Sequence, residues 1–155
     1  MKVNIKDTLT PEGKKFYKML EELAEKEVRI GFQHGEAQDE NGVDICDIAA
    51  FNELGTSKIP SRPFLRDSVD NNEAKINSFL QKRTQDIANG ASAEKILKQI
   101  GVFQKGLVQE EIVNGSFVPN SEATIRRKGS SKPLIDTGRM RQSVNYQIKM
   151  KGSED

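Results

Sequence analysis

The chain has 155 residues with 24 basic and 23 acidic side chains, a formal net charge of +1, so it fits one domain and no global charge attracts it to nucleic acid or membrane. Hydrophobic residues make up 35% and there is no Trp, which predicts a thin core that neighbouring subunits help to stabilise. No apolar run approaches the roughly 20 residues that span a bilayer, and the N-terminal sequence lacks the apolar core of a secretory signal. Cys46 has no second cysteine to pair with. We therefore expect a cytoplasmic protein with no membrane partner.

The first half of the chain predicts a short strand, a helix, a second strand, a polar loop and a second helix, at residues 3–6, 11–25, 27–32, 34–42 and 45–54. Thr10 is a good N-cap for the first helix and the following Pro suits its first turn. Period-two alternation predicts the strand at 27–32. Asp44 caps the second helix, and Gly55 ends it with a positive φ.

The second half predicts a helix from 63 to 89, a helix from 92 to 113, an irregular segment at 114–138, a strand at 143–150 and a frayed tail at 151–155. Pro63 suits the first position of the long helix, and Ser92 can cap the next helix. Gly101 and Gly106, five residues apart, indicate close packing of the next helix against another helix. Residues 1–150 are expected to form one domain, and the long segment at 114–138 is expected to order on assembly.

Few residues offer catalytic chemistry. His34, the single histidine, stands in a polar loop with no apolar frame, so we expect it to be solvated. Cys46 falls among apolar residues of a predicted helix, where a free cysteine behaves as a small core residue. The acidic residues near His34 lack the spacing of an EF-hand, and no second Cys or His stands at metal-ligand spacing. We expect no enzyme, no cofactor and no metal site.

Charge is unevenly distributed along the chain. Residues 21–54 hold ten acidic and two basic side chains, a net of −8, whereas residues 121–150 hold seven basic and two acidic ones, a net of +5. The two segments are either two solvated faces of one subunit or the two halves of a head-to-tail contact between subunits. The basic cluster is Arg126, Arg127, Lys128 and Lys132, which we expect to face either a neighbouring subunit or DNA.

Two sequence blocks resemble a known family. The first is Ile48–Thr56, with Phe51-Asn52-Glu53-Leu54-Gly55-Thr56, followed by Ile59–Arg66 with its Arg62-Pro63-Phe64-Leu65 turn. The second is Lys132–Met140, with Pro133-Leu134-Ile135-Asp136-Thr137-Gly138 before the last strand. Their order and spacing resemble those of phage tail-completion, head–tail joining and virion-morphogenesis proteins of the neck. The motif residues are Glu53, Gly55, Thr56, Arg62, Pro63, Phe64, Asp136, Thr137 and Gly138.

These motif residues also make sense as parts of a scaffold. Thr56 can bond the carbonyls freed at the helix end, Phe64 can anchor the next helix in the core, and Asp136 and Thr137 can cap a turn before the last strand while Gly138 allows a sharp bend. We interpret them as fold-forming residues in the first place, with direct partner contact as the alternative.

The resemblance implies an α/β (α+β) fold like that of tail terminators, with a small, mostly antiparallel sheet packed by two long helices. It also implies a non-enzymatic virion protein, assembled in the bacterial host cytoplasm as a ring of six around the DNA channel. Its partners would be the neck connector and the tail tube. One alternative is a nucleic-acid-binding accessory protein that uses the basic 126–132 segment. Another is a small enzyme built around His34.

Overall fold

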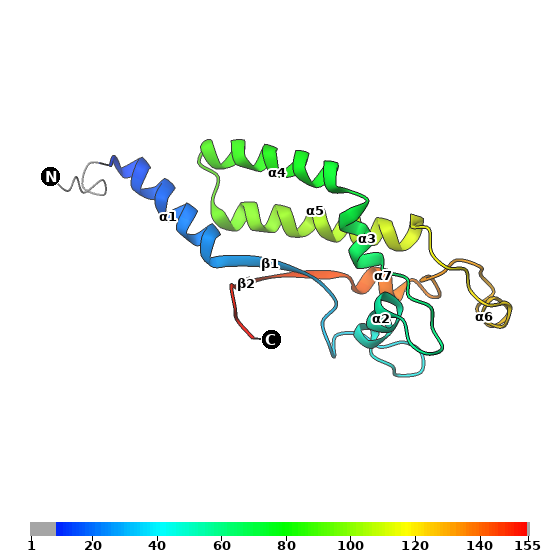
Figure 1. Cartoon of the computed structure of the whole chain (residues 1–155). Coiled ribbons are helices and arrows are strands. Elements are labelled where there is room, and N and C mark those ends of the chain that lie inside the picture. Colours follow the sequence, from blue (N-terminus) through cyan, green and yellow to red (C-terminus); the bar gives the residue numbers. More distant parts are fainter. Residues whose placement is uncertain (1–8, 155) are drawn as a thin grey trace.

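The computed structural model describes residues 9–154, and within them the chain is an α+β protein of seven helices and one two-stranded sheet (Figure 1). The elements follow the chain in the order α1 (Pro11–Glu25), β1 (Lys26–Gly31), α2 (Ile45–Leu54), α3 (Phe64–Asp70), α4 (Glu73–Ala88), α5 (Ala93–Asn114), α6 (Glu122–Lys128), α7 (Arg139–Ser143) and β2 (Asn145–Met150). The predicted fold class is confirmed. The strand predicted at residues 3–6 lies outside the described residues.

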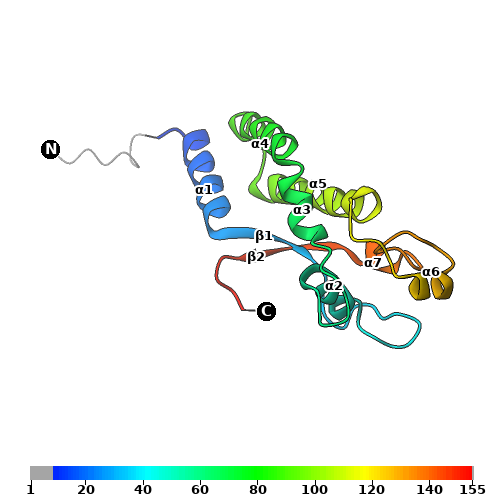
Figure 2. The same ribbon diagram turned by 45° about the vertical axis from the view of Figure 1, so that its right-hand side comes forward.

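The sheet is antiparallel, with a register that runs from Lys26 opposite Met150 to Gly31 opposite Asn145. Helix α5 packs against both strands, while α4 lies on the far side of α5, so α5 carries most of the cover expected from two long helices (Figures 1 and 2). Tyr146 contacts Gly101 of α5. Residues paired across the two strands share a face of the sheet, so the face that carries Tyr146 is the apolar one and lies against α5. The other face is polar, because Arg29 Nε donates to Glu27 Oε1 at 2.7 Å.

Gly101 is required by the strand below it. A Cβ at Gly101 would collide with the ring of Tyr146, so the close approach is between a helix and a strand. Nothing lies within 4 Å of a Cβ built on Gly106. The predicted helix–helix contact at this glycine pair is therefore wrong.

The single helix predicted for residues 63–89 is two helices, α3 and α4, because the chain breaks at Asn71 and Asn72. Asn72 Nδ2 donates to Ser68 O at 3.0 Å, and Asn71 Nδ2 donates to Glu111 Oε1 of α5 at 3.2 Å. Short amide side chains favour such bonds over a continuous helix. Pro63 sits at the N-cap position of α3 and not at its first helical position.

An aromatic stack joins helix α4 to α5. None of the side chains of α4 is buried. The Phe79 ring lies parallel to that of Phe103 of α5, with centroids 4.0 Å apart, and the Arg83 guanidinium lies 4.6 Å from the Phe79 centroid. The stack joins α4 to α5, and the cation–π contact within α4 adds to the packing of the Phe79 ring.

The core lies where α2, α3, α5 and α7 meet. Phe64, the first residue of α3, is fully buried and its ring meets that of Phe32 edge to face, with centroids 5.9 Å apart. The cluster of buried apolar side chains consists of Ile45, Ala49, Phe64, Val108, Ile112, Met140 and Val144. The expected anchoring role of Phe64 agrees with this packing.

The segment predicted to be irregular, 114–138, contains helix α6. Ser121 Oγ accepts from Thr124 N at 3.3 Å, and Gly129 ends the helix in the left-handed conformation. Glu122 in the first turn and three basic residues in the last turn suit the helix dipole. The cap, the charges and the glycine were all readable in the sequence.

The C-terminal part also differs from the prediction. Helix α7 begins directly after Gly138, whose φ is 79°, so the last strand starts at Asn145 and not at Ser143. The tail after Met150 is held, because Lys151 N donates to Glu25 O at 2.8 Å and Arg29 Nη2 donates to Ser153 O at 2.7 Å. The frayed tail predicted for 151–155 is therefore wrong for residues 151–153.

Candidate functional site

A groove of about 530 Å³ opens between α2, α6 and the start of α7. The two sequence blocks that carry the family resemblance meet here, together with part of the basic cluster. The residues that line it include Asp39, Glu40, Ile48, Asn52, Lys58, Arg62, Asn120, Thr124, Arg127, Lys128, Leu134, Asp136, Thr137, Gly138 and Arg139. The groove thus joins segments that are far apart in the sequence.

Arg62 forms the floor of this groove and is 6% exposed. Its guanidinium donates to Val118 O at 2.8 Å, Asn120 Oδ1 at 3.2 Å, Pro119 O at 3.3 Å and Asn52 Oδ1 at 3.3 Å. Burial lowers the pKa of Arg62, although a guanidinium stays charged at neutral pH. Arg62 therefore fastens the segment that leads into α6 onto the end of α2, using neutral acceptors alone.

Glu53 caps a helix that begins eleven residues later. Its carboxylate accepts from Leu65 N at 2.8 Å and from Arg66 N at 3.2 Å. An anion at these free N–H groups stabilises the start of α3. The N-terminus of α3, which lacks a side-chain bond from Pro63, is thus completed by a residue of α2.

Gly55 and Thr56 shape the turn between α2 and Arg62. Gly55 has φ 77°, as expected for the end of α2, and a Cβ there would lie 2.9 Å from Ser61 N. Thr56 Oγ1 accepts from Lys58 N at 3.2 Å and Ile59 N at 3.0 Å. Thr56 therefore stabilises the turn by accepting backbone N–H bonds, and the predicted bond to the carbonyls of α2 is wrong.

The second block closes the other wall of the groove. Thr137 Oγ1 accepts from Arg139 N at 3.4 Å, and Gly138 takes the left-handed conformation that starts α7. Asp136 is exposed and its charge acts on Lys128 across the groove. The capping role expected of this block belongs to Thr137 and Gly138.

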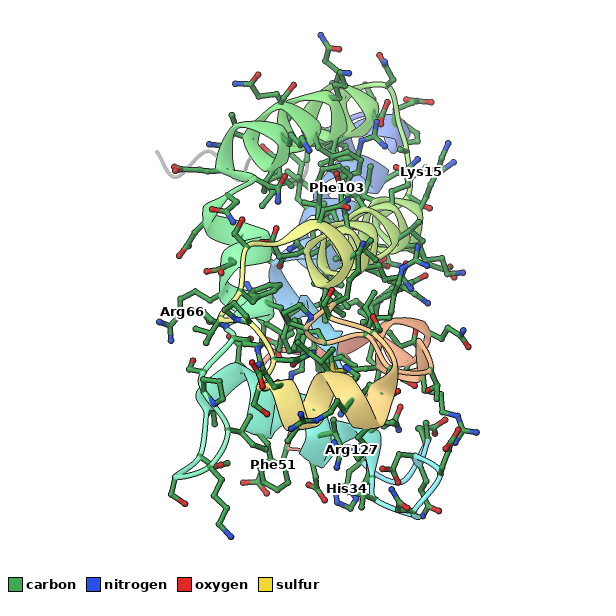
Figure 3. The ribbon with its side chains drawn as sticks, turned by 90° about the vertical axis from the view of Figure 1, so that its right-hand side faces the viewer. Lys15, His34, Phe51, Arg66, Phe103 and Arg127 are labelled. Atoms are coloured by element: carbon green, nitrogen blue, oxygen red, sulfur yellow. The ribbon has the colours of Figure 1, made fainter. Side chains whose placement is uncertain are left out.

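The basic residues are divided between the surface and the groove. Arg126 and Arg127 are exposed on the last turn of α6, and Figure 3 labels Arg127 there. Lys128 is half-buried, and burial lowers its pKa while Asp136 opposes the shift. Lys132 is exposed and its carbonyl accepts from Asn120 Nδ2 at 3.1 Å. Arg126 and Lys132 are thus free to meet a partner, whereas Lys128 belongs to the groove and Arg127 is an exposed residue of its lining.

Part of the acidic segment, residues 21–54, faces the basic segment, residues 121–150, within the same subunit. Arg139 Nη1 donates to Gln38 O at 3.0 Å, and the charge of Arg139 helps to lower the pKa of Asp39, an effect led by the Val43 N–H bond. Asp39 and Glu40 share the groove with Arg127 and Lys128. These acids and bases therefore partly neutralise each other inside one chain.

His34 has more structure around it than its sequence suggested. It is exposed (Figure 3), but its Nδ1 lies 3.2 Å from Asp44 Oδ2 and its Nε2 lies 3.9 Å from Asp47 Oδ1. Gly35 N and Cys46 N donate to Asp44 and lower its pKa. Cys46 is half-buried and its Sγ lies 3.7 Å from Phe32 O, while burial raises the pKa of its thiol. These contacts hold the loop before α2 in place.

Two residues of the first block have no role in the groove. Phe51 is 45% exposed and Leu54 is 74% exposed. The two residues that stand between Phe51 and Leu54 in the sequence are engaged, because Asn52 accepts from Arg62 and Glu53 accepts from the first turn of α3. This difference could not be predicted from the sequence, because the pattern of α2 does not show which of its faces is covered. The amides of Asn52 and Asn120, both bonded to Arg62, were also missed.

Between residues 9 and 154 there is no group of three His, Cys, Asp or Glu side chains that could hold a metal ion. No helix in that range is long and apolar enough to cross a membrane. Comparison of the chain with protein-family models, with curated proteins and with solved structures gives no match in any of the three.

Proposed function

We propose that this chain is a structural subunit of a tailed-phage or prophage particle. In this proposal it assembles with copies of itself as a ring of six in the neck, or at the head-proximal end of the tail, and joins the neck connector to the tail tube. The resemblance of the two sequence blocks to tail-completion and head–tail joining proteins supports the virion assignment. Their meeting around Arg62 and the groove gives both blocks a shared structural role.

The observation that carries the proposal is the large surface of the subunit. The chain exposes 10628 Å², whereas a compact monomer of 17.3 kDa exposes about 7,800 Å². The nine residues outside the described part add at most about 1,500 Å² at the area per mass of an extended chain. A compact protein of the mass of residues 9–154 exposes about 7,500 Å², so these residues expose about 1,600 Å² more than that.

This excess has the size expected for self-association. A standard interface removes about 800 Å² from each partner, so about 1,600 Å² corresponds to two interfaces on each subunit. A closed ring of head-to-tail contacts needs two interfaces per subunit. Exposed Phe, Tyr, Leu and Val side chains on several helices supply apolar surface for such contacts.

Deletion of the coding sequence from the phage or prophage that carries it tests the proposal. We expect filled heads and tails that fail to join, seen by negative-stain microscopy, and we expect a plasmid copy to restore infectious titre. The chain should also be present in purified particles. Infectious particles at normal titre without the chain would show that the proposal is wrong.

A nucleic-acid-binding role is the second candidate, favoured by the exposed Arg126 and Arg127 of α6, a helix that lies at one end of the molecule (Figure 1). Binding through phosphate contacts weakens steeply with salt. Salt-dependent DNA binding by the isolated subunit, lost in Arg126→Gln/Arg127→Gln, would favour this candidate. A self-associating chain with no DNA affinity would favour the ring.

A further inference from the structure

Helix α2 presents an apolar pair that the fold of the subunit leaves uncovered. Phe51 and Leu54 are three residues apart and so lie side by side on the helix surface, and they are 45% and 74% exposed. The opposite side of α2 is occupied by the core residues Ile45 and Ala49. Because Asn52 and Glu53 are bonded to Arg62 and α3, the apolar pair is held rigidly in place.

Helix α1 presents a second uncovered apolar surface. Phe16, Tyr17 and Leu20 are 39%, 50% and 37% exposed, whereas Met19 is the one buried side chain of this helix. The rings of Phe16 and Tyr17 meet edge to face, with centroids 6.3 Å apart. Helix α1 thus packs on α5 and β1 with one side only.

We propose that α1 of one copy docks through Phe16, Tyr17 and Leu20 onto Phe51 and Leu54 of the next copy. The inference rests on the proposed self-association and names its contact surfaces. Helices α1 and α2 lie at opposite ends of the sheet in both views (Figures 1 and 2). One subunit therefore cannot satisfy both surfaces by itself, and the contact is head-to-tail, as a ring requires.

The first half of α1 and helix α2 carry opposite charges. Lys14, Lys15 and Lys18 are exposed in this half of α1 against one acid, Glu12, whereas the other acids of the helix, Glu21, Glu22 and Glu25, follow Leu20 in its second half. Residues 44–54 carry Asp44, Asp47 and Glu53 and no basic residue. Opposite charges favour α1 on α2, while two copies of α2 face to face would bring like charges together. The excess surface of the subunit is also large enough for one such contact at each end.

Mixing two assembly-defective variants tests this pairing. Tyr17→Glu/Leu20→Glu disables the α1 surface and Phe51→Glu/Leu54→Glu disables the α2 surface. In sedimentation velocity the wild-type chain should associate and each variant should be a monomer. Their mixture should form a 1:1 dimer and nothing larger, because each variant retains the surface that the other lacks. Val102→Glu, at a residue of α5 that is 61% exposed, is the matched control and should assemble like the wild type.

A second variant reverses two charges and leaves the apolar contact residues unchanged. Lys14→Glu/Lys18→Glu changes two exposed side chains of α1 and should weaken association at least about tenfold at low salt, with a smaller effect at high salt. A monomeric wild type, assembly of both apolar variants, a mixture that stays monomeric, or an unchanged charge variant would each overturn the proposed contact. Apolar variants that assemble, combined with unjoined particles after deletion of the coding sequence, would refute this contact and leave the proposed virion function standing.

Discussion

Replacing Arg62 by Met removes the guanidinium but keeps an unbranched side chain, so it isolates the hydrogen bonds that fasten residues 118–120 to α2. The guanidinium makes four bonds to Val118 O, Pro119 O, Asn120 Oδ1 and Asn52 Oδ1 at 2.8–3.3 Å. Arg62→Met leaves these acceptors without their donor. The change should loosen the segment that leads into α6 and reduce the free energy of unfolding.

The size of the loss follows from two opposing contributions. Each hydrogen bond that involves a charged group contributes about 1.5–3 kcal/mol, but burying a charge costs several kcal/mol, and Arg62 is 6% exposed. We therefore expect a net loss of about 2–4 kcal/mol, well below the sum of four bonds. Because all four acceptors are neutral, added NaCl should leave this difference unchanged.

Urea unfolding measures the loss. With a denaturant dependence of about 2 kcal/mol per M, the middle of the usual range, the midpoint should fall by about 1–2 M. Trypsin should also cut after Arg126 and Arg127 faster than in the wild type, since a loosened segment opens more often. Arg66→Met, at an exposed position of α3, is the matched control. A loss for Arg62→Met no larger than that of the control, with unchanged proteolysis, would refute the fastening role of Arg62.

Three further predictions test the scaffold around the groove. Glu53→Ala should cost about 1–2 kcal/mol in urea unfolding because it uncaps α3, and Glu53→Gln should cost less; equal losses would contradict capping by the carboxylate. Phe64→Ala should reduce the free energy of unfolding by about 3–5 kcal/mol, whereas His34→Ala should leave folding and self-association unchanged. A Phe64→Ala variant as stable as the wild type, or a His34→Ala variant that fails to assemble in sedimentation velocity, would contradict the structure. The N–H groups of Gly35 and Cys46 lower the pKa of Asp44, so the contribution of the Asp44 carboxylate to stability is complete above its usual pKa and is lost as the pH falls through the lowered pKa. In thermal melting between pH 7 and 2.5, the melting temperature of Asp44→Asn should therefore depend less on acid than that of the wild type. An unchanged acid dependence would contradict this reasoning.

Features that depend on a few neighbouring residues were predictable from the sequence. The N-caps at Thr10, Asp44 and Ser92 each accept a backbone N–H as expected, and helices α1, α2 and α5 start where these caps predicted. Helix α6 had the same kind of signal in Ser121 and Gly129, so its omission was an error of interpretation. The break between α3 and α4 depends partly on the bond of Asn71 to Glu111, which no local pattern reveals.

The groove could not be predicted in the same way. The sequence blocks predict roles for some of its residues one by one, but their meeting depends on contacts such as that of Arg62 with Val118, 56 positions away. The exposure of Phe51 and Leu54 depends on which side of α2 the core covers. Apolar periodicity predicts that a helix has an apolar face but not whether its own chain covers that face.

The pairing of β1 with β2 has a consequence for the order in which the protein folds. Lys26 and Met150 are partners in the register, so the two strands close a loop of well over one hundred residues, which carries a high entropic cost. Helical segments form much faster than such distant pairings. During synthesis β1 has no partner until residue 150 has left the ribosome, and until then the side of α5 around Gly101 stays open to solvent. Sheet closure is thus expected to be the late, rate-limiting step of folding, and a chaperone that shields this side of α5 would act before that step.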